Sequence, residues 1–303
     1  MHPSAPTRWS CLMFASLALV ALIPVAARAQ AVQRSLFASV TDSKGVPVPG
    51  VTPADVVVRE DGVQREVLRV TPATEPMQIA VLVDTSVALN PEVTNVRQAL
   101  EAFTDKMTPE HQLAIVEYGD RPNVLADTTS DPVLLKKGIN AIFPRPGSGA
   151  YLLDAILETS RGFQKREDPR PVIVVLAMED VEFSNANYDR VLDAVKASGA
   201  SLNVLLLTRQ EGPDMATEEA RARAIVIDRG TRETGGLRQN LLSGMAFKSA
   251  LDALAEDLLH QWRVVYGHPQ TLIPPQQVTI EAARPGLTVR GTPARPPKAA
   301  KGD

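Results

Sequence analysis

A run of apolar residues that ends in an aspartate, at residues 78–88, constrains the fold of this chain more than any other feature. The run reads QIAVLVDTSVA, so five consecutive apolar residues, Ile79 to Val83, precede Asp84. An unbroken apolar run of this length is typical of a strand buried on both faces, as in a parallel sheet between helices. Asp84 then follows the carboxyl end of the strand, where doubly wound sheets bind their ligands.

The surrounding residues, 75–262, alternate between strand and helix patterns. Apolar runs predict strands at 78–84, 112–118, 171–177 and 201–207. Apolar residues spaced three or four apart predict helices at 93–107, 153–163, 188–195 and 247–262. The residues Glu233-Thr234-Gly235-Gly236 are typical of a helix end closed by glycine. This alternation predicts an α/β fold, with a doubly wound, mostly parallel sheet flanked by helices.

Strand patterns also lie on both sides of this α/β region. An N-terminal β segment is predicted at 30–74, with a hairpin turn at Asp61-Gly62 between strands at 56–58 and 67–70. Further strands are predicted at 263–291. Because an isolated hairpin is marginally stable in water, we expect these segments to pack together as a small β module. The tail, 292–303, has little to bury and is predicted to be disordered.

The first 29 residues are typical of a signal peptide. An apolar run from Cys11 to Val25 follows Arg8, and Ala27-Arg28-Ala29 is a small-x-small cleavage site. The run is too short for a permanent membrane span. We therefore expect an exported protein, periplasmic or secreted, without a stable membrane span after cleavage. Cleavage removes two arginines and the only cysteine, so the formal net charge falls from −3 to −5. This charge argues against nucleic acid as a partner.

Several short motifs, in their order along the chain, resemble the von Willebrand factor type A family. They are Glu60-Asp61-Gly62, Val83-Asp84-Thr85-Ser86, Glu233–Gly236 and Arg284–Val289. The order is similar to that of the VWFA-related proteins of the Acidobacterial type. The resemblance implies an exported protein with a Rossmann-like A-type domain. Such domains generally serve adhesion or protein–protein contact, in many cases through a divalent metal completed by a partner's carboxylate.

The resemblance also implies a metal site built from three loops, and this chain departs from the pattern in each. Asp84 and Ser86 match the first loop, but the last serine of that loop is Ala88. Ala150 stands at the threonine position of the second loop. Met178 stands at the aspartate position of the third loop, and a thioether is a poor ligand for a hard cation. The metal-ion-dependent adhesion site is therefore expected to be degenerate.

Two interpretations of these residues stay open. In one, Glu179 and Asp180 join Asp84 and Ser86, Ser148 substitutes for the missing threonine, and waters complete a weak Mg²⁺ or Mn²⁺ site. In the other, which we favour, Asp84 and Ser86 cap the loop and the next helix through backbone hydrogen bonds, and no cofactor is bound.

Enzymatic chemistry has little support in the sequence. His111, His260 and His268 are scattered, and Ser148 between two glycines lacks the spacing of a nucleophile elbow. Gly147–Gly149 before a helix is a weak anion-site pattern. The charged run Glu218–Arg223 predicts a solvated helix face.

We therefore expect an exported, non-enzymatic module that binds an unidentified protein partner through the carboxyl-edge loops, without tight metal binding. A metal-dependent adhesion domain is the alternative. A hydrolase that uses Asp84, Glu179 and Asp180 is the least favoured possibility.

Overall fold

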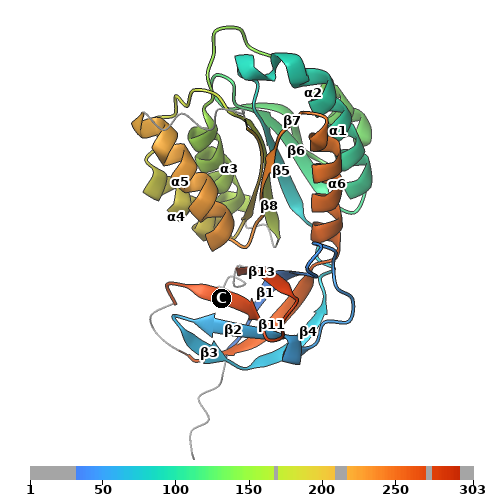
Figure 1. Ribbon diagram of the computed structural model, residues 1–303, viewed down its shortest axis with the longest axis vertical. Coiled ribbons are helices and arrows are strands. Elements are labelled where there is room, and N and C mark those ends of the chain that lie inside the picture. The colour runs from blue at the N-terminus through green and yellow to red at the C-terminus, as the bar shows by residue number, and fades with distance from the viewer. Residues whose placement is uncertain (1–31, 167–169, 209–216, 271–274, 294–303) are drawn as a thin grey trace, which may run out of the picture.

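The computed structural model describes residues 32–166, 170–208, 217–270 and 275–293. It contains an α/β domain and a smaller β module, which lies beneath the α/β domain in the view of Figure 1. The predicted signal peptide, 1–29, lies outside the described residues. Within these described ranges, no helix has the length and apolar character needed to cross a membrane.

A six-stranded sheet forms the centre of the α/β domain. Its order is β10-β9-β8-β5-β6-β7, and neighbouring strands are parallel except β6 and β7. The strands are β5 (Gln78–Val83), β6 (Gln112–Glu117), β7 (Asn123–Thr129), β8 (Pro171–Met178), β9 (Ser201–Leu207) and β10 (Arg238–Leu241). The predicted doubly wound, mostly parallel sheet is confirmed.

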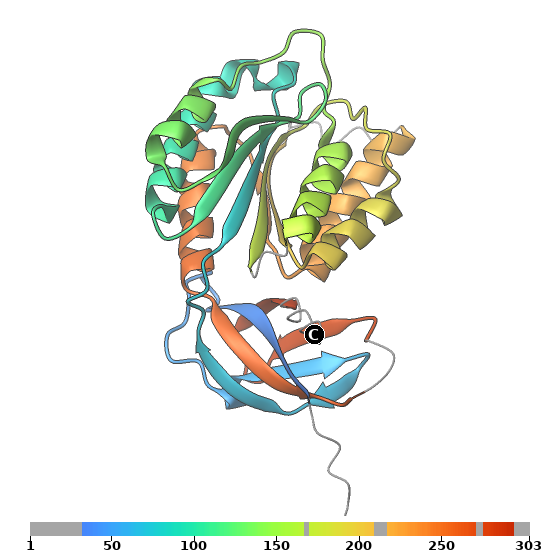
Figure 2. The ribbon, with the colours of Figure 1, turned by 180° about the vertical axis from the view of Figure 1, so that it is seen from behind.

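Helices cover both faces of this sheet (Figures 1 and 2). One face carries α1 (Val93–Met107), α2 (Pro132–Asn140) and α6 (Ala246–Leu259), and the other carries α3 (Leu152–Arg166), α4 (Tyr188–Ser198) and α5 (Glu218–Glu233). Side chains of a strand point alternately to the two faces. Accordingly Ile79, Val81 and Val83 of β5 lie in the core with α1 and α6, whereas Ala80 and Leu82 lie in the opposite core. This explains the unbroken apolar run.

The β module consists of two antiparallel sheets, with the orders β13-β1-β11-β4 and β12-β2-β3. Its strands are β1 (Val32–Thr41), β2 (Val56–Glu60), β3 (Val63–Arg65), β4 (Val67–Pro72), β11 (Trp262–His268), β12 (Val278–Ala282) and β13 (Thr288–Pro293). Strand β1 pairs with β11 and β13, and β2 pairs with β12. The predicted packing of the N-terminal segment with the C-terminal strands is confirmed.

Three local expectations are corrected. Asp61 and Gly62 make the expected turn with positive φ angles, but the hairpin joins β2 to the short β3, and β4 pairs with β11 instead. Trp262 begins β11 and does not end α6. Thr292 and Pro293 belong to β13, where the Thr292 hydroxyl donates to the Thr234 carbonyl, and residues 294–303 lie outside the described residues.

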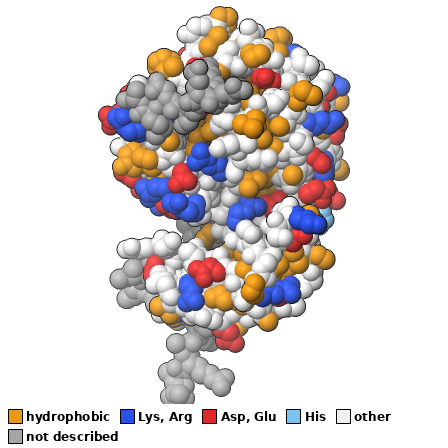
Figure 3. Space-filling view, in the orientation of Figure 1, with side chains coloured by type: hydrophobic (Ala, Val, Ile, Leu, Met, Phe, Trp, Pro, Cys, Tyr) orange, Lys and Arg blue, Asp and Glu red, His pale blue; other side chains and the backbone are white. Residues whose placement is uncertain are grey.

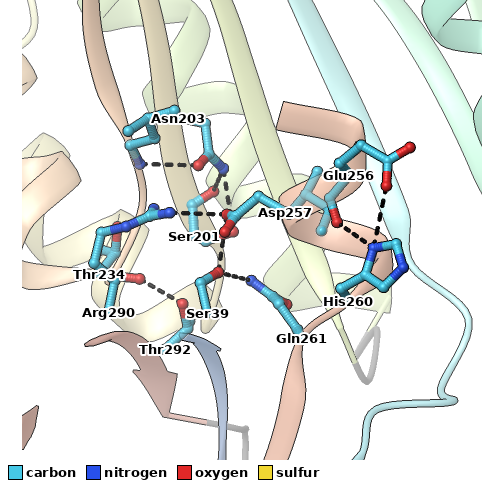
Figure 4. A network of polar contacts seen from close by, with 12 residues as sticks. Ser39, Ser201, Asn203, Thr234, Glu256, Asp257, His260, Gln261, Arg290 and Thr292 are labelled. Atoms are coloured by element: carbon cyan, nitrogen blue, oxygen red, sulfur yellow. Dashed lines mark hydrogen bonds and ion pairs between the residues drawn. The ribbon is translucent and has the colours of Figure 1, made fainter. Parts of the chain in front are cut away.

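A buried polar network joins the β module to the α/β domain (Figure 4). The Arg170 Nη2 group, just before β8, donates to the Leu258 carbonyl at 2.7 Å and to Gln261 Oε1 at 2.8 Å. Gln261 Nε2 in turn donates to the Ser39 hydroxyl of β1 at 3.0 Å. Burial lowers the pKa of Arg170 to about 10. These contacts place the β module at the amino end of the parallel strands, so their carboxyl edge points away from it (Figure 1).

Candidate functional site

The carboxyl edge of the sheet brings together three loops, which follow β5 (the first loop), α2 (the second loop, 141–151) and β8 (the third loop), beside the end of β6. The backbone N–H of Asp84 donates to the Leu176 carbonyl of β8, and that of Tyr118 donates to the Val83 carbonyl of β5. The Tyr118 side chain is fully buried and its hydroxyl donates to the Leu176 carbonyl at 3.0 Å. Burial raises the pKa of the Tyr118 hydroxyl well above its ordinary value, so it stays a neutral donor.

Asp84 is fully buried, and backbone groups satisfy its carboxylate. Oδ1 accepts from the Ser86 N–H at 2.9 Å and Oδ2 accepts from the Met178 N–H at 3.1 Å. Burial raises the pKa of Asp84, although the charge of Arg223 and the hydrogen bonds of Ser86 and Met178 oppose the shift. Asp84 therefore ties the first loop to the end of β8, as expected of a loop cap.

Ser86 is also buried, and it precedes the 3₁₀ helix η2 (Val87–Glu92). Its side chain makes no capping hydrogen bond to that helix. Among the described residues, its hydroxyl oxygen meets no hydrogen-bond partner of ordinary geometry. The expected capping role therefore holds for the side chain of Asp84 but not for that of Ser86.

Glu117 holds the first and second loops together. It is buried at the end of β6, accepts from the Thr85 hydroxyl at 3.3 Å, and forms an ion pair with Arg145. The Arg145 N–H also donates to the Thr85 carbonyl at 2.8 Å. Ser148, further along the second loop, donates to the Arg145 carbonyl at 2.9 Å. The hydroxyl of Ser148 thus stabilises its own loop.

Glu179 and Asp180, in the third loop, are both partly exposed. Asp180 Oδ1 accepts from the Val181 N–H at 2.8 Å, and its backbone carbonyl accepts from Arg223 Nη1 at 2.9 Å. In the part of the chain that the structure describes, no three His, Cys, Asp or Glu side chains lie close enough to hold a metal ion.

The side chains of Glu182 and Ser184 connect this loop to the first residues of α3. Glu182 Oε1 accepts from the Leu153 N–H at 3.4 Å, and the Ser184 hydroxyl accepts from the Asp154 N–H at 3.1 Å. The start of α3 is where the glycine-rich pattern suggested a weak anion site. The protein's own carboxylate occupies it, which suits the partial positive charge of a helix N-terminus.

Arg223 of α5 is a buried cation at this edge. It is 7% exposed, its Nη2 donates to the Met178 carbonyl at 2.6 Å, and its Nε lies 3.7 Å from Glu182 Oε2. Burial raises the pKa of Glu182 to about 7, against the opposing charge of Arg223. The expectation that residues 218–223 form a solvated face is therefore wrong at Arg223.

A family model for the von Willebrand factor type A domain matches residues 79–180, which span β5 to the end of β8. The chain contains a von Willebrand factor type A domain. No curated protein matches the sequence.

Solved structures show the same fold. Proximal thread matrix protein 1 from the mussel byssus has a TM-score of 0.50 at 15% identity, with 62% of this chain and 50% of that chain covered. This chain therefore spans half the length of that relative. A von Willebrand factor type A protein from Catenulispora acidiphila has a TM-score of 0.48 at 9% sequence identity, with 88% of this chain and 74% of that chain covered. The conserved hypothetical protein BatB from Bacteroides thetaiotaomicron has a TM-score of 0.44 at 16% sequence identity, with 60% of this chain and 98% of that chain covered. Such low identities show likeness of fold alone.

The A-type domain of this chain does not fit a divalent metal at the position that the family resemblance implies. Both Asp84 oxygens accept backbone N–H groups, and Ala88, Ala150 and Met178 offer no oxygen side chain. A guanidinium, that of Arg223, already lies at the third loop. The buried Ser86 hydroxyl, which has no hydrogen bond of ordinary geometry to any described residue, is the feature that favours a metal. The candidate ligands Asp84, Ser86, Glu179 and Asp180 stay a prediction.

The histidines lie away from this edge of the A-type domain. His268 is buried in the β module, where its Nδ1 lies 2.8 Å from Glu60 Oε2. His111 Nδ1 accepts from the Met77 N–H at 3.4 Å, near the amino end of β5. His260, exposed after α6, contacts Glu256.

Arg223 and Glu182 belong to this site although their sequence patterns do not predict it. Arg223, Ile227 and Gly230 are all buried in α5 and are spaced by three or four residues, so they share the helix face that packs on the sheet. That spacing was the available signal. No such pattern marks Glu182, because its partners come from other elements.

Proposed function

We propose that this chain is an exported, non-enzymatic binding module that contacts another protein through the carboxyl-edge loops of its A-type domain, without tight metal binding. A-type domains generally serve protein–protein contact. We further propose that the chain is of the VWFA-related Acidobacterial type, on the strength of its motif order. The N-terminal segment typical of a signal peptide supports export to the periplasm or the exterior.

The exposed apolar side chains of the carboxyl edge carry this proposal. Val87, Val181 and Phe183 are 49%, 54% and 51% exposed, whereas Asp84 and Glu182 of the same loops are buried and Glu179 and Asp180 are partly exposed. Hydrophobic side chains reach the surface at the upper end of the molecule in the space-filling view (Figure 3). Exposed apolar side chains with buried polar groups beneath them are typical of a contact surface for another protein.

Phe183 is held in a defined position, which suits a contact residue. Its ring lies so close to Gly149 that a Cβ there would approach it within 2.2 Å. The ring centroid of Tyr151 lies 6.1 Å away. The backbone of Phe183 also donates to the Ala150 carbonyl at 2.8 Å. An anchored aromatic residue loses little conformational freedom on binding, so its burial contributes more to affinity.

The test is capture of a partner from the native envelope fraction, with residues 30–303 as bait. We expect Phe183→Asp to reduce recovery of the captured protein at least tenfold, about 1.4 kcal/mol or more of binding free energy. The matched control is Val63→Asp, which changes a 55% exposed valine of the β module. Equal recovery with Phe183→Asp and wild type, while both remain folded, contradicts the proposal.

The buried hydroxyl of Ser86, which lies beside Asp84 without a hydrogen bond of ordinary geometry to the described part of the chain, favours a second candidate, a metal-dependent adhesion domain completed by a partner's carboxylate. Capture in EDTA and in Mg²⁺ or Mn²⁺ separates the two candidates. If binding does not depend on metal, as we propose, equal amounts of the partner should be recovered in all three conditions. The second candidate is supported instead if EDTA abolishes capture and added metal restores it. In that case, an Asp84→Ala variant should capture no partner even when metal is present.

A further inference from the structure

The guanidinium of Arg223 holds the end of β8 and the third loop in place through hydrogen bonds to their backbone. Nη2 and Nη1 donate to two carbonyls of this loop, those of Met178 at 2.6 Å and Asp180 at 2.9 Å. Two charge-assisted hydrogen bonds to carbonyls two residues apart define the path of the chain between them. Arg223 comes from α5, 45 residues from Met178 along the sequence, so this contact depends on the tertiary fold.

Two buried carboxylates, those of Glu182 and Asp84, lie near this cation. Glu182, 4% exposed, pairs with Arg223 Nε at 3.7 Å. Asp84 accepts from the N–H of Met178, the residue whose carbonyl accepts from Arg223. The N–H groups of Leu153 and Ser184 donate to Glu182 Oε1, whereas Oε2 meets Arg223 only as an ion pair, without hydrogen-bond geometry. The charge of Arg223 and these N–H groups offset part of the cost of burying the carboxylate.

We propose that Arg223 replaces a divalent metal as the cation of the carboxyl edge, and that it holds residues 178–182 in their binding conformation. Arg223 is thus a positioning residue. The inference deepens the proposed function, and rests on it for the role of the loops. It concerns the folded chain alone, so measurements without a partner test it separately.

The replacement accounts for the substitutions at the family's ligand positions. A divalent ion beside a buried guanidinium would be repelled, because like charges at short range in a low-dielectric interior interact strongly. With Arg223 present, a carboxylate at position 178 has no cation to coordinate. Met178, 1% exposed, instead packs in the core with Leu176 of the same strand. The loss of ligands and the gain of an internal cation are therefore two parts of one change.

Removal of the guanidinium is expected to create a metal site. In Arg223→Ala, the carboxylates of Asp84 and Glu182 lose the charge of Arg223, and we expect a divalent ion with its waters to take the place of the guanidinium. At a metal concentration about 100 times its Kd, we expect Mn²⁺ or Mg²⁺ to raise the Tm of this variant by roughly 5 °C or more. Wild type and the control Arg232→Ala, a 67% exposed arginine of the same helix, are expected to shift by less than about 1 °C.

Addition of Asp84→Ala to Arg223→Ala is expected to abolish the metal-dependent shift. A shift in wild type as large as that of Arg223→Ala overturns the proposal, because the site would then hold metal beside the arginine. A folded Arg223→Ala variant without any metal-dependent shift also overturns it. Partner capture enters neither measurement, so these results are independent of the proposed function.

A second set of variants covers the case in which Arg223→Ala does not fold. Arg223→Gln leaves the Glu182 carboxylate buried without its partner, whereas Arg223→Gln with Glu182→Gln removes both charges. At a pH well above 7, where the carboxyl group of Glu182 is charged, we expect the double variant to have a higher Tm than Arg223→Gln alone, and Arg223→Lys to retain part of the wild-type Tm. A double variant no more stable than Arg223→Gln overturns the proposal, because Arg223 would then not act through charge.

Discussion

Ser39 of β1 donates a 2.9 Å hydrogen bond to Asp257 of α6, although 218 residues separate them in the sequence. The same Asp257 oxygen, Oδ2, accepts from Arg290 Nη2 of β13 at 2.9 Å (Figure 4). One carboxylate of the α/β domain therefore binds both the first and the last strand of the β module. These contacts explain how two small β segments act as a base for the A-type domain.

Asp257→Ala is expected to weaken this junction. The substitution leaves Arg290 and the buried Ser39 hydroxyl without their acceptor, which costs about 1–3 kcal/mol of unfolding free energy. Urea denaturation measures the change. Asp252→Ala is the control, because Asp252 lies on the same helix, is 65% exposed and pairs with Lys106. A loss no greater than that of Asp252→Ala, within about 0.5 kcal/mol, would contradict the prediction.

The pH dependence of stability reports on Glu60, which is buried in the β module. Burial raises the pKa of Glu60, but hydrogen bonds from His268, Arg65 and Tyr266 outweigh it, and the net pKa is lowered. A carboxyl group with a lowered pKa in the folded state stabilises the fold above its ordinary pKa. This contribution is lost as the pH falls through the folded-state value.

We therefore expect wild-type stability to fall between about pH 5 and pH 2, and Glu60→Gln to remove part of that slope. Chemical denaturation at a series of pH values measures it. Glu281→Gln is the control, because Glu281 lies in the same module, is 59% exposed and pairs with Arg59 at 3.7 Å. Parallel curves for wild type and Glu60→Gln would disprove the assignment.

Much of the fold could be predicted from local patterns in the sequence, whereas the hydrogen-bond and ion-pair partners of the buried polar side chains could not. The apolar run at Ile79–Val83 predicted a doubly buried strand because alternate side chains enter two cores. The periodicity that reached Trp262 failed to mark the end of α6. Gln261, bonded to Arg170 and Ser39, lies where the chain leaves the helix, and these distant partners are invisible in the sequence.

The candidate site shows the same division. Asp84 was found because an acidic residue after a buried strand is a local signal. The partners of Arg223 are two backbone carbonyls and Glu182, from the last residue of β8 and the loop after it. A mixed-charge run gives no indication that one of its arginines is buried, unless the helix face of each residue is considered.

Deletion of residues 263–291 tests whether the β module depends on its C-terminal strands. Strand β1 would lose both its partners, and β2 and β4 would lose β12 and β11. We expect limited proteolysis to cleave residues 32–72 in this variant at least tenfold faster than in wild type, because unpaired strands open locally. A truncation after Pro293, which keeps all described strands, is the control. Unchanged protection of residues 32–72 would refute the prediction.

Alanine substitutions at Gly235 and Gly286 form a matched pair of variants. Their comparison isolates the effect of the contact between the A-type domain and the β module. The φ angles of the two glycines are +67° and +84°, so alanine at either position costs about 1–2 kcal/mol in backbone strain. A Cβ on Gly286 meets no atom within 4 Å, whereas a Cβ on Gly235 lies 2.2 Å from the Gly291 carbonyl oxygen of β13. That backbone atom moves only if β13 shifts away from the end of α5.

Gly235→Ala is therefore expected to cost about 1–3 kcal/mol more than Gly286→Ala in the free energy of unfolding. Because the clash lies between the A-type domain and β13, the extra loss should come with faster amide exchange in β13 and β1, while the central sheet stays protected. Urea denaturation and hydrogen exchange of both variants measure the two effects. Equal losses in the two variants would show that Gly291 yields at little cost, and that the close packing of Gly235 on β13 does not hold the β module in place.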